Sequence, residues 1–336
     1  MQSRGHRHQT ARFSAILWRL IVRASHIHKF NGGMNMYILK PILDKNWENT
    51  AKNDAKRIAS QTEPEGLVKI LDIPYIDDGE KAHLLDIYYP EETTEKLPVI
   101  IDIHGGGWMY GYKEINKNFC LKLAEKGFLV ASINYRLAGD VLFDDQIRDI
   151  FAALKWLSEN LKDYPADLDN VFLAGDSAGG HFACVTTAVN LNEDFQKDFG
   201  VEHCGLDFKA VSAICPAVDL LSPNIVMNIN VPLLLGDKPK KSKYRKYLDV
   251  AQLLSKDFPP FYVNTATNDF LKKQCYKLKA LLEEYKIPHF FHDFKEKENG
   301  KYLTHVFNVI DPFTPAGDQA NTEIAEFFKA RMTTKA

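Results

Sequence analysis

The stretch AGDSAGGH, residues 174–181, decides how the rest of this chain is interpreted. Gly175 to Gly179 fits the pattern G-x-S-x-G, in which a serine occupies a sharp turn between a strand and a helix. The preceding VFLAGD is typical of a buried strand, and AGGHFACVTTAVNL, which begins at Ala178, is typical of a helix. Only small residues, including Gly180, leave room for so tight a turn. We therefore predict a strained backbone at Ser177, whose hydroxyl projects above the sheet as a nucleophile.

Working outward from this turn, we find short apolar runs that recur along the chain. Eight of them predict strands, at residues 68–76, 84–90, 98–103, 128–134, 171–175, 210–215, 261–266 and 289–294. The last five are separated by segments long enough for crossover helices, which favours a parallel sheet covered on both faces. The first three follow one another closely, and we expect them to be antiparallel or edge strands. The predicted class is α/β, with an eight-stranded, mostly parallel sheet and helices on both faces.

Apolar stripes predict the helices between these strands. Ile147, Ile150 and Leu154 recur at helical spacing, as do Leu271 and Leu278 further along. A last helix is expected at about residues 318–330. We interpret these stripes as core packing.

Three segments lie outside this alternation, while residues 67–331 are expected to form one domain. Residues 36–66 look helical, and residues 220–258 form a long insertion after the sixth strand. An insertion of that length at the rim of a sheet is typical of a lid, so we interpret both segments as a small cap. Residues 1–35 are rich in arginine and lack an unbroken apolar signal core. We expect a dispensable, disordered extension there, with a weak membrane-surface helix as the alternative.

A serine nucleophile needs a base to take its proton and an acid to hold that base in the correct tautomer. In this type of fold the partners follow in the order serine, acid, histidine. Asp269 comes directly after the seventh predicted strand, and His305 comes after the eighth. Both lie at the carboxyl edge of the sheet, as does the turn at Ser177. We therefore predict a catalytic triad of Ser177, Asp269 and His305.

Other histidines and aspartates fit these roles less well. His289 and His292 lie within a predicted strand, and His181 lies in the helix after the turn. Asp176 adjoins the nucleophile, but we expect its side chain to face elsewhere and to have a structural role. Asp257 precedes a strand and would lie at the wrong edge of the sheet.

The glycine-rich segment HGGGW, residues 104–108, follows the third predicted strand directly. The fold places an oxyanion-binding loop at this position. Glycines let backbone N–H groups converge without side chains in the way. We predict an oxyanion hole formed by the N–H groups of Gly106 and Gly107, together with that of Ala178 at the start of its helix.

Composition narrows the classes of partner. A formal net charge of −2 supplies no overall attraction to nucleic acid or to an anionic membrane, and we expect no stable membrane insertion. The five cysteines form no C-x-x-C pair, which favours the reducing cytoplasm. No cluster of metal ligands is recognisable, and we expect neither a metal nor a cofactor. Whether the chain forms a homo-oligomer is left open.

The motifs HGGGW, INYRLA (133–138), GDSAGGH and LTHVF (303–307) together resemble the hormone-sensitive-lipase-like branch of the α/β-hydrolase superfamily, close to feruloyl-esterase-domain-like carboxylesterases. The resemblance covers roughly residues 67–331. It implies a carboxylic-ester hydrolase with a cap over an acyl pocket, acting on small or short-acyl esters. The family usually has YRLAPE where this chain has YRLAGD, and this difference concerns the shape of one loop.

Three alternatives use the same scaffold. An arylformamidase-type amide hydrolase would use the same machinery, although related formamidases often have a tyrosine where this chain has Gly107. A peptidase would usually need an additional substrate-selecting domain, for which there is no room. A ligand-binding receptor resembling the plant gibberellin receptors would lack the catalytic histidine, whereas His305 is present.

Overall fold

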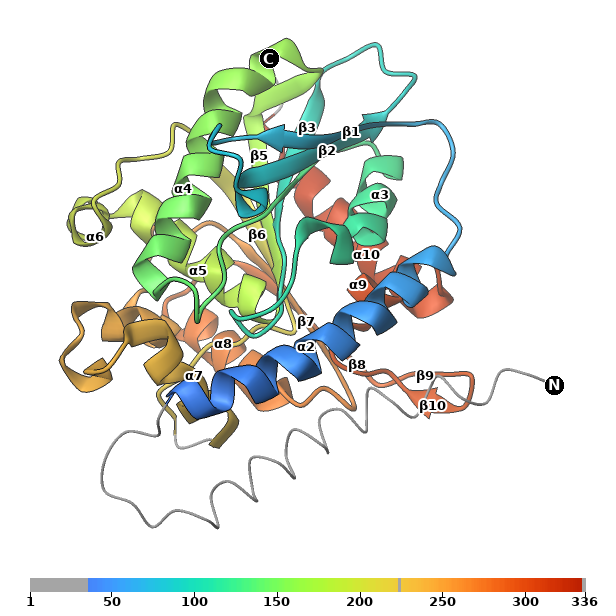
Figure 1. Ribbon diagram of the computed structural model, residues 1–336. Coiled ribbons are helices and arrows are strands. Elements are labelled where there is room, and N and C mark those ends of the chain that lie inside the picture. Colours follow the sequence, from blue (N-terminus) through green and yellow to red (C-terminus); the bar gives the residue numbers. More distant parts are fainter. Residues whose placement is uncertain (1–35, 223–224, 334–336) are drawn as a thin grey trace.

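The computed structural model describes residues 36–222 and 225–333 (Figure 1). Its main sheet has eight strands: β1 (Leu67–Pro74), β2 (Leu84–Pro90), β3 (Leu97–Ile103), β4 (Leu129–Ile133), β5 (Ala166–Asp176), β6 (Phe208–Ile214), β7 (Phe261–Ala266) and β8 (His289–Phe294). The α-helices are α2 (Met36–Ala59), α3 (Lys117–Glu125), α4 (Phe143–Asn160), α5 (Ala178–Leu191), α6 (Glu193–Phe199), α7 (Ile225–Leu235), α8 (Lys272–Glu284), α9 (Phe307–Ile310) and α10 (Pro315–Lys329). Short 3-10 turns include η3 (Lys113–Ile115), η5 (Pro239–Lys241), η6 (Lys243–Leu248) and η7 (Val250–Gln252), and β9 (Lys297–Glu298) pairs with β10 (Lys301–Tyr302).

The strand order is β1-β2-β4-β3-β5-β6-β7-β8. β1 and β2 are antiparallel to their neighbours, and β4 to β8 form the parallel part together with β3. The expectation of an α/β fold with an eight-stranded, mostly parallel sheet is confirmed. The expectation that the third strand is antiparallel or at an edge is wrong. The chain crosses over from β3 to β4 through α3, so that β4 pairs with β2 and β3 lies between β4 and β5. β3 is parallel to both of these neighbours.

The two faces of β3 pack against different helices. Val99, Ile101 and Ile103 join the core cluster that contains apolar residues of α4, α5 and α8, whereas Ile100 joins the cluster under α3 and α10. Because successive strand residues point to opposite faces, this alternation means that helices cover both faces. Figure 1 shows α3, α9 and α10 on one side of the sheet and α4, α5 and α8 on the other.

The segments outside the alternation also have regular structure. Residues 36–66 were expected to be helical, but helix α2 ends at Ala59 and residues 60–66 are not helical. The Ser60 hydroxyl donates to the Arg57 carbonyl at the helix end, and Pro64 disfavours a helical residue before it. The insertion at 220–258 contains α7 and the turns η5 to η7. Its interpretation as a cap, together with α2, stays a prediction. The segment 1–35 lies outside the described residues.

Candidate active site

Ser177 occupies the turn between β5 and α5 with φ 54° and ψ −112°, a conformation that non-glycine residues rarely adopt. Backbone hydrogen bonds hold it there. Its N–H donates to Ile214 O at 2.8 Å, and its carbonyl accepts from the N–H groups of Ala217 at 3.0 Å and His181 at 3.2 Å. The turn is therefore attached to the end of β6 from both sides, which offsets the strain in the serine backbone.

The glycines of this turn are required by close backbone contacts. A Cβ atom on Gly179 would lie 1.9 Å from Ile103 O, and one on Gly175 would lie 2.3 Å from Gly179 O. On Gly180 it would lie 2.9 Å from the Pro216 side chain. No side chain fits at the first two positions without moving the backbone, as the sequence analysis predicted for this turn.

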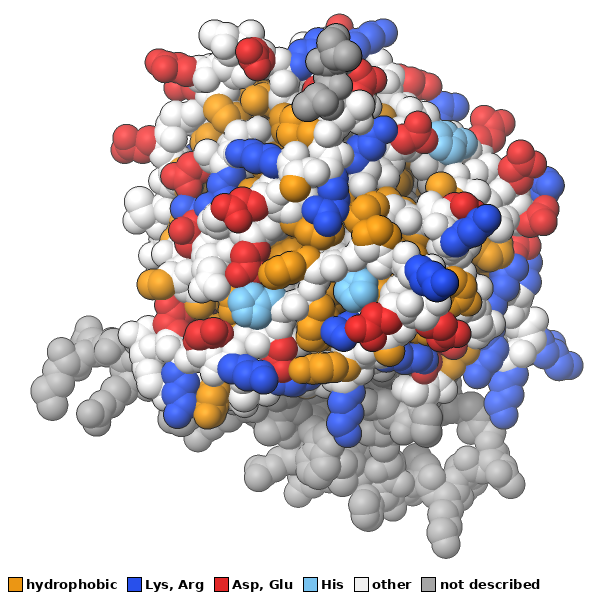
Figure 2. Space-filling model, turned by 180° about the vertical axis from the view of Figure 1, so that it is seen from behind, with side chains coloured by type: hydrophobic (Ala, Val, Ile, Leu, Met, Phe, Trp, Pro, Cys, Tyr) orange, Lys and Arg blue, Asp and Glu red, His pale blue; other side chains and the backbone are white. Residues whose placement is uncertain are grey.

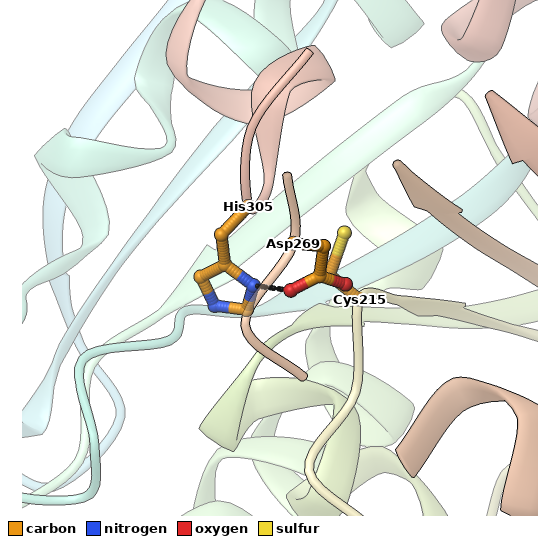
Figure 3. Close-up of side chains that lie close together, drawn as sticks. All are labelled: Cys215, Asp269 and His305. Atoms are coloured by element: carbon orange, nitrogen blue, oxygen red, sulfur yellow. Dashed lines mark hydrogen bonds and ion pairs between the residues drawn. The ribbon is translucent and has the colours of Figure 1, made fainter. Parts of the chain in front are cut away.

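The structure brings together the three residues of the predicted triad. His305 Nε2 lies 2.9 Å from Ser177 Oγ, and His305 Nδ1 lies 2.6 Å from Asp269 Oδ1 (Figure 3 shows the second pair). An ionised carboxylate only accepts hydrogen bonds, so Nδ1 carries the proton and Nε2 of the neutral ring accepts from the serine hydroxyl. This tautomer is the one in which imidazole can remove the serine proton.

Asp269 is buried and held by several donors. Burial alone would raise the pKa of this carboxyl, but the hydrogen bond and charge of His305, with further bonds from Thr265 and Leu271, hold the pKa below its ordinary value. Thr265 Oγ1 donates to Oδ2 at 2.7 Å and the Leu271 N–H donates to Oδ1 at 2.8 Å. The carboxylate therefore stays ionised and fixed in orientation beside the imidazole.

Cys215 lies beside this pair, fully buried at the end of β6. Figure 3 shows its sulfur next to the Asp269 carboxylate, on the side away from the imidazole. Its backbone has φ 44°, and its Sγ accepts a hydrogen bond from the N–H of Val306, the residue after His305, at 3.3 Å. Cys215 thus connects the end of β6 to the histidine loop. In the sequence Cys215 only ends the apolar run AVSAIC (210–215), which does not indicate a contact with the histidine loop.

Cys215, Asp269 and His305 also offer one potential metal-ligand atom each, all within 4.8 Å of one another. A cysteine binds metal as the thiolate. Burial, followed by the nearby Asp269 carboxylate, raises the pKa of this thiol well above its ordinary value. The Asp269 and His305 atoms are already joined by a short hydrogen bond. The donor set therefore fits a hydrogen-bonded pair with a thiol beside it better than a metal centre.

The glycine loop lies next to the turn at Ser177, and the buried His104 contacts its backbone. Burial lowers the pKa of His104 to about 4, so the ring is neutral, and its Nδ1 lies 2.8 Å from Gly105 O. Gly106 and Gly107 have φ of 125° and 62°, which favour glycine. Within the described part of the chain, the N–H groups of Gly106, Gly107 and Ala178 make no hydrogen bond. These are the three predicted oxyanion donors.

A buried polar network connects the glycine loop with the residue before Ser177. Asp176 Oδ1 accepts from the Gly105 N–H at 2.8 Å and from Asn116 Nδ2 at 2.9 Å. The same amide donates to Asp102 Oδ2 at 3.0 Å. Asp176 therefore faces away from the reacting atoms and anchors the glycine loop, the kind of structural role expected of it. Asp102 and Asn116 carry no sequence motif and were not predicted.

The competing histidines have other partners. His181 accepts from Trp108 Nε1 at 3.3 Å and its Nε2 lies 2.9 Å from Tyr247 O, while burial lowers its pKa to about 4. His292 pairs with the Glu323 carboxylate, and His289 Nδ1 lies 2.9 Å from Ile287 O. Asp257 is exposed, before β7.

A cavity of about 530 Å³ lies elsewhere, between α2 and the turn η3. Its lining includes Ala55, Ile58, Glu63, Tyr112 and Glu114, and none of the triad or glycine-loop residues. It is therefore distinct from the place where Ser177 and His305 meet. Within residues 36–222 and 225–333, no helix has the length and apolar character needed to cross a membrane.

Comparison with known proteins agrees with this architecture. Residues 85–282 match the family model BD-FAE. The chain is 31% identical over 209 residues to the probable carboxylic ester hydrolase LipM of Mycobacterium tuberculosis; the match covers 60% of this chain and 48% of LipM, so the chain spans about half the length of that relative. The crystal structure of esterase B from Lactobacillus Rhamnosis superposes with a TM-score of 0.83 at 29% identity, covering 89% of this chain and 96% of that one. Esterase B inhibited by a C4-C4 tributyrin phosphonate gives 30% identity, 89% and 97% coverage and the same TM-score.

Fold and comparisons together define an enzyme class, the carboxylesterases of the α/β-hydrolase superfamily related to hormone-sensitive lipase. The resemblance stated from the sequence motifs is confirmed. Within that class, the chain belongs to the BD-FAE family, whose model matches more than half of its 336 residues.

Proposed function

We propose that this protein hydrolyses carboxylic esters of small or short-acyl substrates through an acyl-enzyme on Ser177. The observation that carries the proposal is the position of one imidazole, whose Nε2 lies 2.9 Å from Ser177 Oγ while its Nδ1 lies 2.6 Å from Asp269. A serine hydroxyl is a weak nucleophile unless a base of this kind removes its proton.

In the first half-reaction, Ser177 Oγ attacks the ester carbonyl carbon as its proton passes to His305 Nε2. The carbonyl π electrons move to oxygen, and Asp269 stabilises the imidazolium without taking the proton. The tetrahedral intermediate collapses, the bond to the alkoxy oxygen breaks, and His305 protonates the leaving alcohol. In the second half-reaction, water gives a proton to His305 as its oxygen attacks the acyl carbon. The second tetrahedral intermediate collapses, the bond between Ser177 Oγ and the acyl carbon breaks, and His305 returns its proton to Ser177 Oγ as the acid leaves.

The developing oxyanion is assigned to the N–H groups of Gly106, Gly107 and Ala178. Two observations support this assignment. The three groups are without hydrogen-bond partners in the described chain, and Ala178 begins an α-helix, whose N-terminal end favours negative charge. Donors of this type act in place from the start of the reaction, and losing one lowers the rate by about 10²–10³-fold.

The short-acyl preference rests on similarity. Esterase B, with a TM-score of 0.83, is inhibited by a phosphonate with C4 arms. We take α2 and residues 220–258 to form the cap over the acyl chain. All five cysteines are free and buried, which supports a reducing compartment such as the cytoplasm. Charges of both signs are interspersed on the face seen in Figure 2, which supports a small-molecule substrate over nucleic acid.

Hydrolysis of p-nitrophenyl acetate, butyrate and octanoate by the wild-type protein and by Ser177→Ala tests the proposal. We expect turnover that falls from butyrate to octanoate and is lost in the variant. Equal rates for the two proteins would refute a Ser177 esterase. Faster, Ser177-dependent turnover of formanilide than of the matched phenyl ester would instead identify the arylformamidase alternative.

A further inference from the structure

Helix α2 lies outside the part of the chain that matches the family model, yet it contacts Tyr110, two residues after the glycine loop. The indole of Trp47 stacks on the ring of Tyr110, with ring centroids 4.8 Å apart and an angle of 7° between the planes. The Tyr110 hydroxyl donates to Asp54 Oδ2 at 2.7 Å. Tyr110 is buried, and its hydrogen bond to a carboxylate is of the stronger, charge-assisted kind. The side chain of Tyr110, just after the glycine loop, is thus held by two side chains of α2.

Tyr110 is connected in turn to the proposed oxyanion donors. Its N–H donates to Gly106 O at 3.0 Å. In a planar trans peptide the C=O and the following N–H point in opposite directions, so this bond sets the direction of the Gly107 N–H. The approach is close, because a Cβ on Gly106 would lie 1.9 Å from Tyr110 O. A displacement of Tyr110 would therefore turn the peptide that carries a donor.

Residues at and just after the C-terminal end of α2 contact α9, the short helix that follows the histidine. Arg57 donates to Ile310 O at 2.9 Å and to Ile115 O at 3.2 Å, and Gln61 donates to Ile310 O at 2.7 Å. Ile310 ends α9, whose first turn is closed by a hydrogen bond from the Ile310 N–H to Val306 O at 3.0 Å, one residue after His305. Figure 1 shows α2 as a long diagonal helix with this end beside α9. This helix and the residues just after it therefore connect Tyr110, which follows the glycine loop, with α9, which follows the histidine.

We propose that α2 is a strap that positions the oxyanion donors through Asp54 and Tyr110, in addition to any role as a cap. Asp54, Tyr110 and Trp47 are positioning residues, since none of them is placed against the reacting atoms. The inference rests on the proposed esterase function. It requires that loosening the Tyr110 hydroxyl weakens binding of the oxyanion more than binding of the ground-state ester.

Tyr110→Phe tests this because it keeps the ring against Trp47 and removes the hydroxyl, which bonds to Asp54 and also contacts the Tyr112 hydroxyl. Tyr276→Phe is the matched control, since the Tyr276 hydroxyl makes an equal 2.7 Å bond to Asp293 Oδ2 on the exposed surface. For both variants we would measure kcat and KM with p-nitrophenyl butyrate, the melting temperature, and the inhibition constant of an alkyl trifluoromethyl ketone. That inhibitor forms a hemiketal with the serine, and its oxyanion occupies the donor site.

For Tyr110→Phe we expect kcat to fall about 5- to 30-fold, less than for outright loss of a donor, because the donor is displaced and not removed. KM should stay within about twofold, and inhibitor binding should weaken by the same factor as kcat/KM. Asp54→Asn keeps an acceptor oxygen and should restore most of the activity that Asp54→Ala loses. Tyr276→Phe should behave as wild type.

A purely structural role predicts a different pattern. If Tyr110→Phe and Asp54→Ala lower the melting temperature but leave kcat and inhibitor binding unchanged, the strap proposal is wrong. Should Tyr110→Phe fail to fold, the comparison of Asp54→Asn with Asp54→Ala decides the question by the same readouts. A wild-type protein without Ser177-dependent turnover would refute the proposed esterase function instead, so the two failures are distinguishable.

Discussion

Replacing Asp102 with asparagine should change how stability depends on pH. Asp102 lies in the middle of the sheet with no exposed surface, and its contacts are Asn116, Cys120 and Ser132. Burial, and then the neighbouring Asp176 carboxylate, raise the pKa of this carboxyl from 3.8 to about 7. Between these two values the native chain keeps a proton that the unfolded chain has lost.

The sign and size follow from linkage. The native state binds more protons than the unfolded state between about pH 4 and pH 7, so this group lowers the free energy of unfolding as pH rises through that window. From pH 5 to about pH 7 the native state holds one proton more than the unfolded state. At about 1.4 kcal/mol per pH unit, the free energy of unfolding falls by about 2–3 kcal/mol over these two units. Asparagine has no such titration. The buried, neutral His104 and His181, with pKa values of about 4, contribute the opposite slope in both proteins.

The assay is urea unfolding, followed by tryptophan fluorescence, of wild type and Asp102→Asn at pH 5, 6, 7 and 8. The slope common to the histidines cancels in the difference between the two proteins. That difference should shift in favour of the variant by about 2–3 kcal/mol from pH 5 to pH 7, and stay level above. Asp257→Asn, at an exposed site, is the control for losing a carboxylate where water screens the charge. A difference for Asp102→Asn that is constant across the range, or that moves the other way, would refute the reasoning.

Three further substitutions test the site. Asp269→Asn should lower kcat by about 10⁴-fold, because an amide no longer holds His305 in the required tautomer; stopped-flow and steady-state rates check this, and a loss below tenfold would contradict it. Gly106→Ala should lose more than about 10²-fold in kcat, since its Cβ would meet backbone at 1.9 Å. Gly79→Ala, also at positive φ but with open space around it, should stay active, so equal losses would point to backbone strain alone. Phe270 is 61% exposed, and its ring centroid lies 4.2 Å from that of His305, where it could contact the leaving alcohol. Phe270→Ala should therefore reduce the preference for benzyl over methyl acetate by about 2- to 12-fold, which corresponds to an aromatic contact of about 0.5–1.5 kcal/mol. An unchanged ratio of kcat/KM for the two acetates would rule out contact with the leaving alcohol.

The elements that the sequence predicted well share one property, which is that local pattern and chain order specify them. The turn at Ser177 is encoded within eight residues, and its strand and helix follow from hydrophobic period alone. Asp269 and His305 each follow a recognisable strand, and parallel strands end at one edge of the sheet. Their order along the chain was therefore enough to predict that the three side chains would meet.

The place of β3 shows where this reasoning ends. Its apolar run looks the same whether the strand is at an edge or central, because both environments favour the same residue types over five or six positions. What places β3 between β4 and β5 is the crossover through α3, whose apolar residues pack on the face that includes Ile100. Strand pairing of this kind depends on contacts between distant segments, and hydrophobic period does not report them.

The network around Tyr110 was beyond sequence reasoning for a related reason. Asp54 and Tyr110 are 56 residues apart, neither belongs to a motif, and an aspartate in a helix and a tyrosine in a loop are common. Their pairing appears only once α2 is docked against the glycine loop. The side chains of the proposed triad are held by elements whose register the sheet dictates, whereas the glycine loop, the proposed source of two oxyanion donors, has three glycines in a row and no register of its own. Conformational freedom that lets N–H groups converge also lets them diverge, so a loop of this composition needs an external anchor, and the contacts of Tyr110 with α2 provide one.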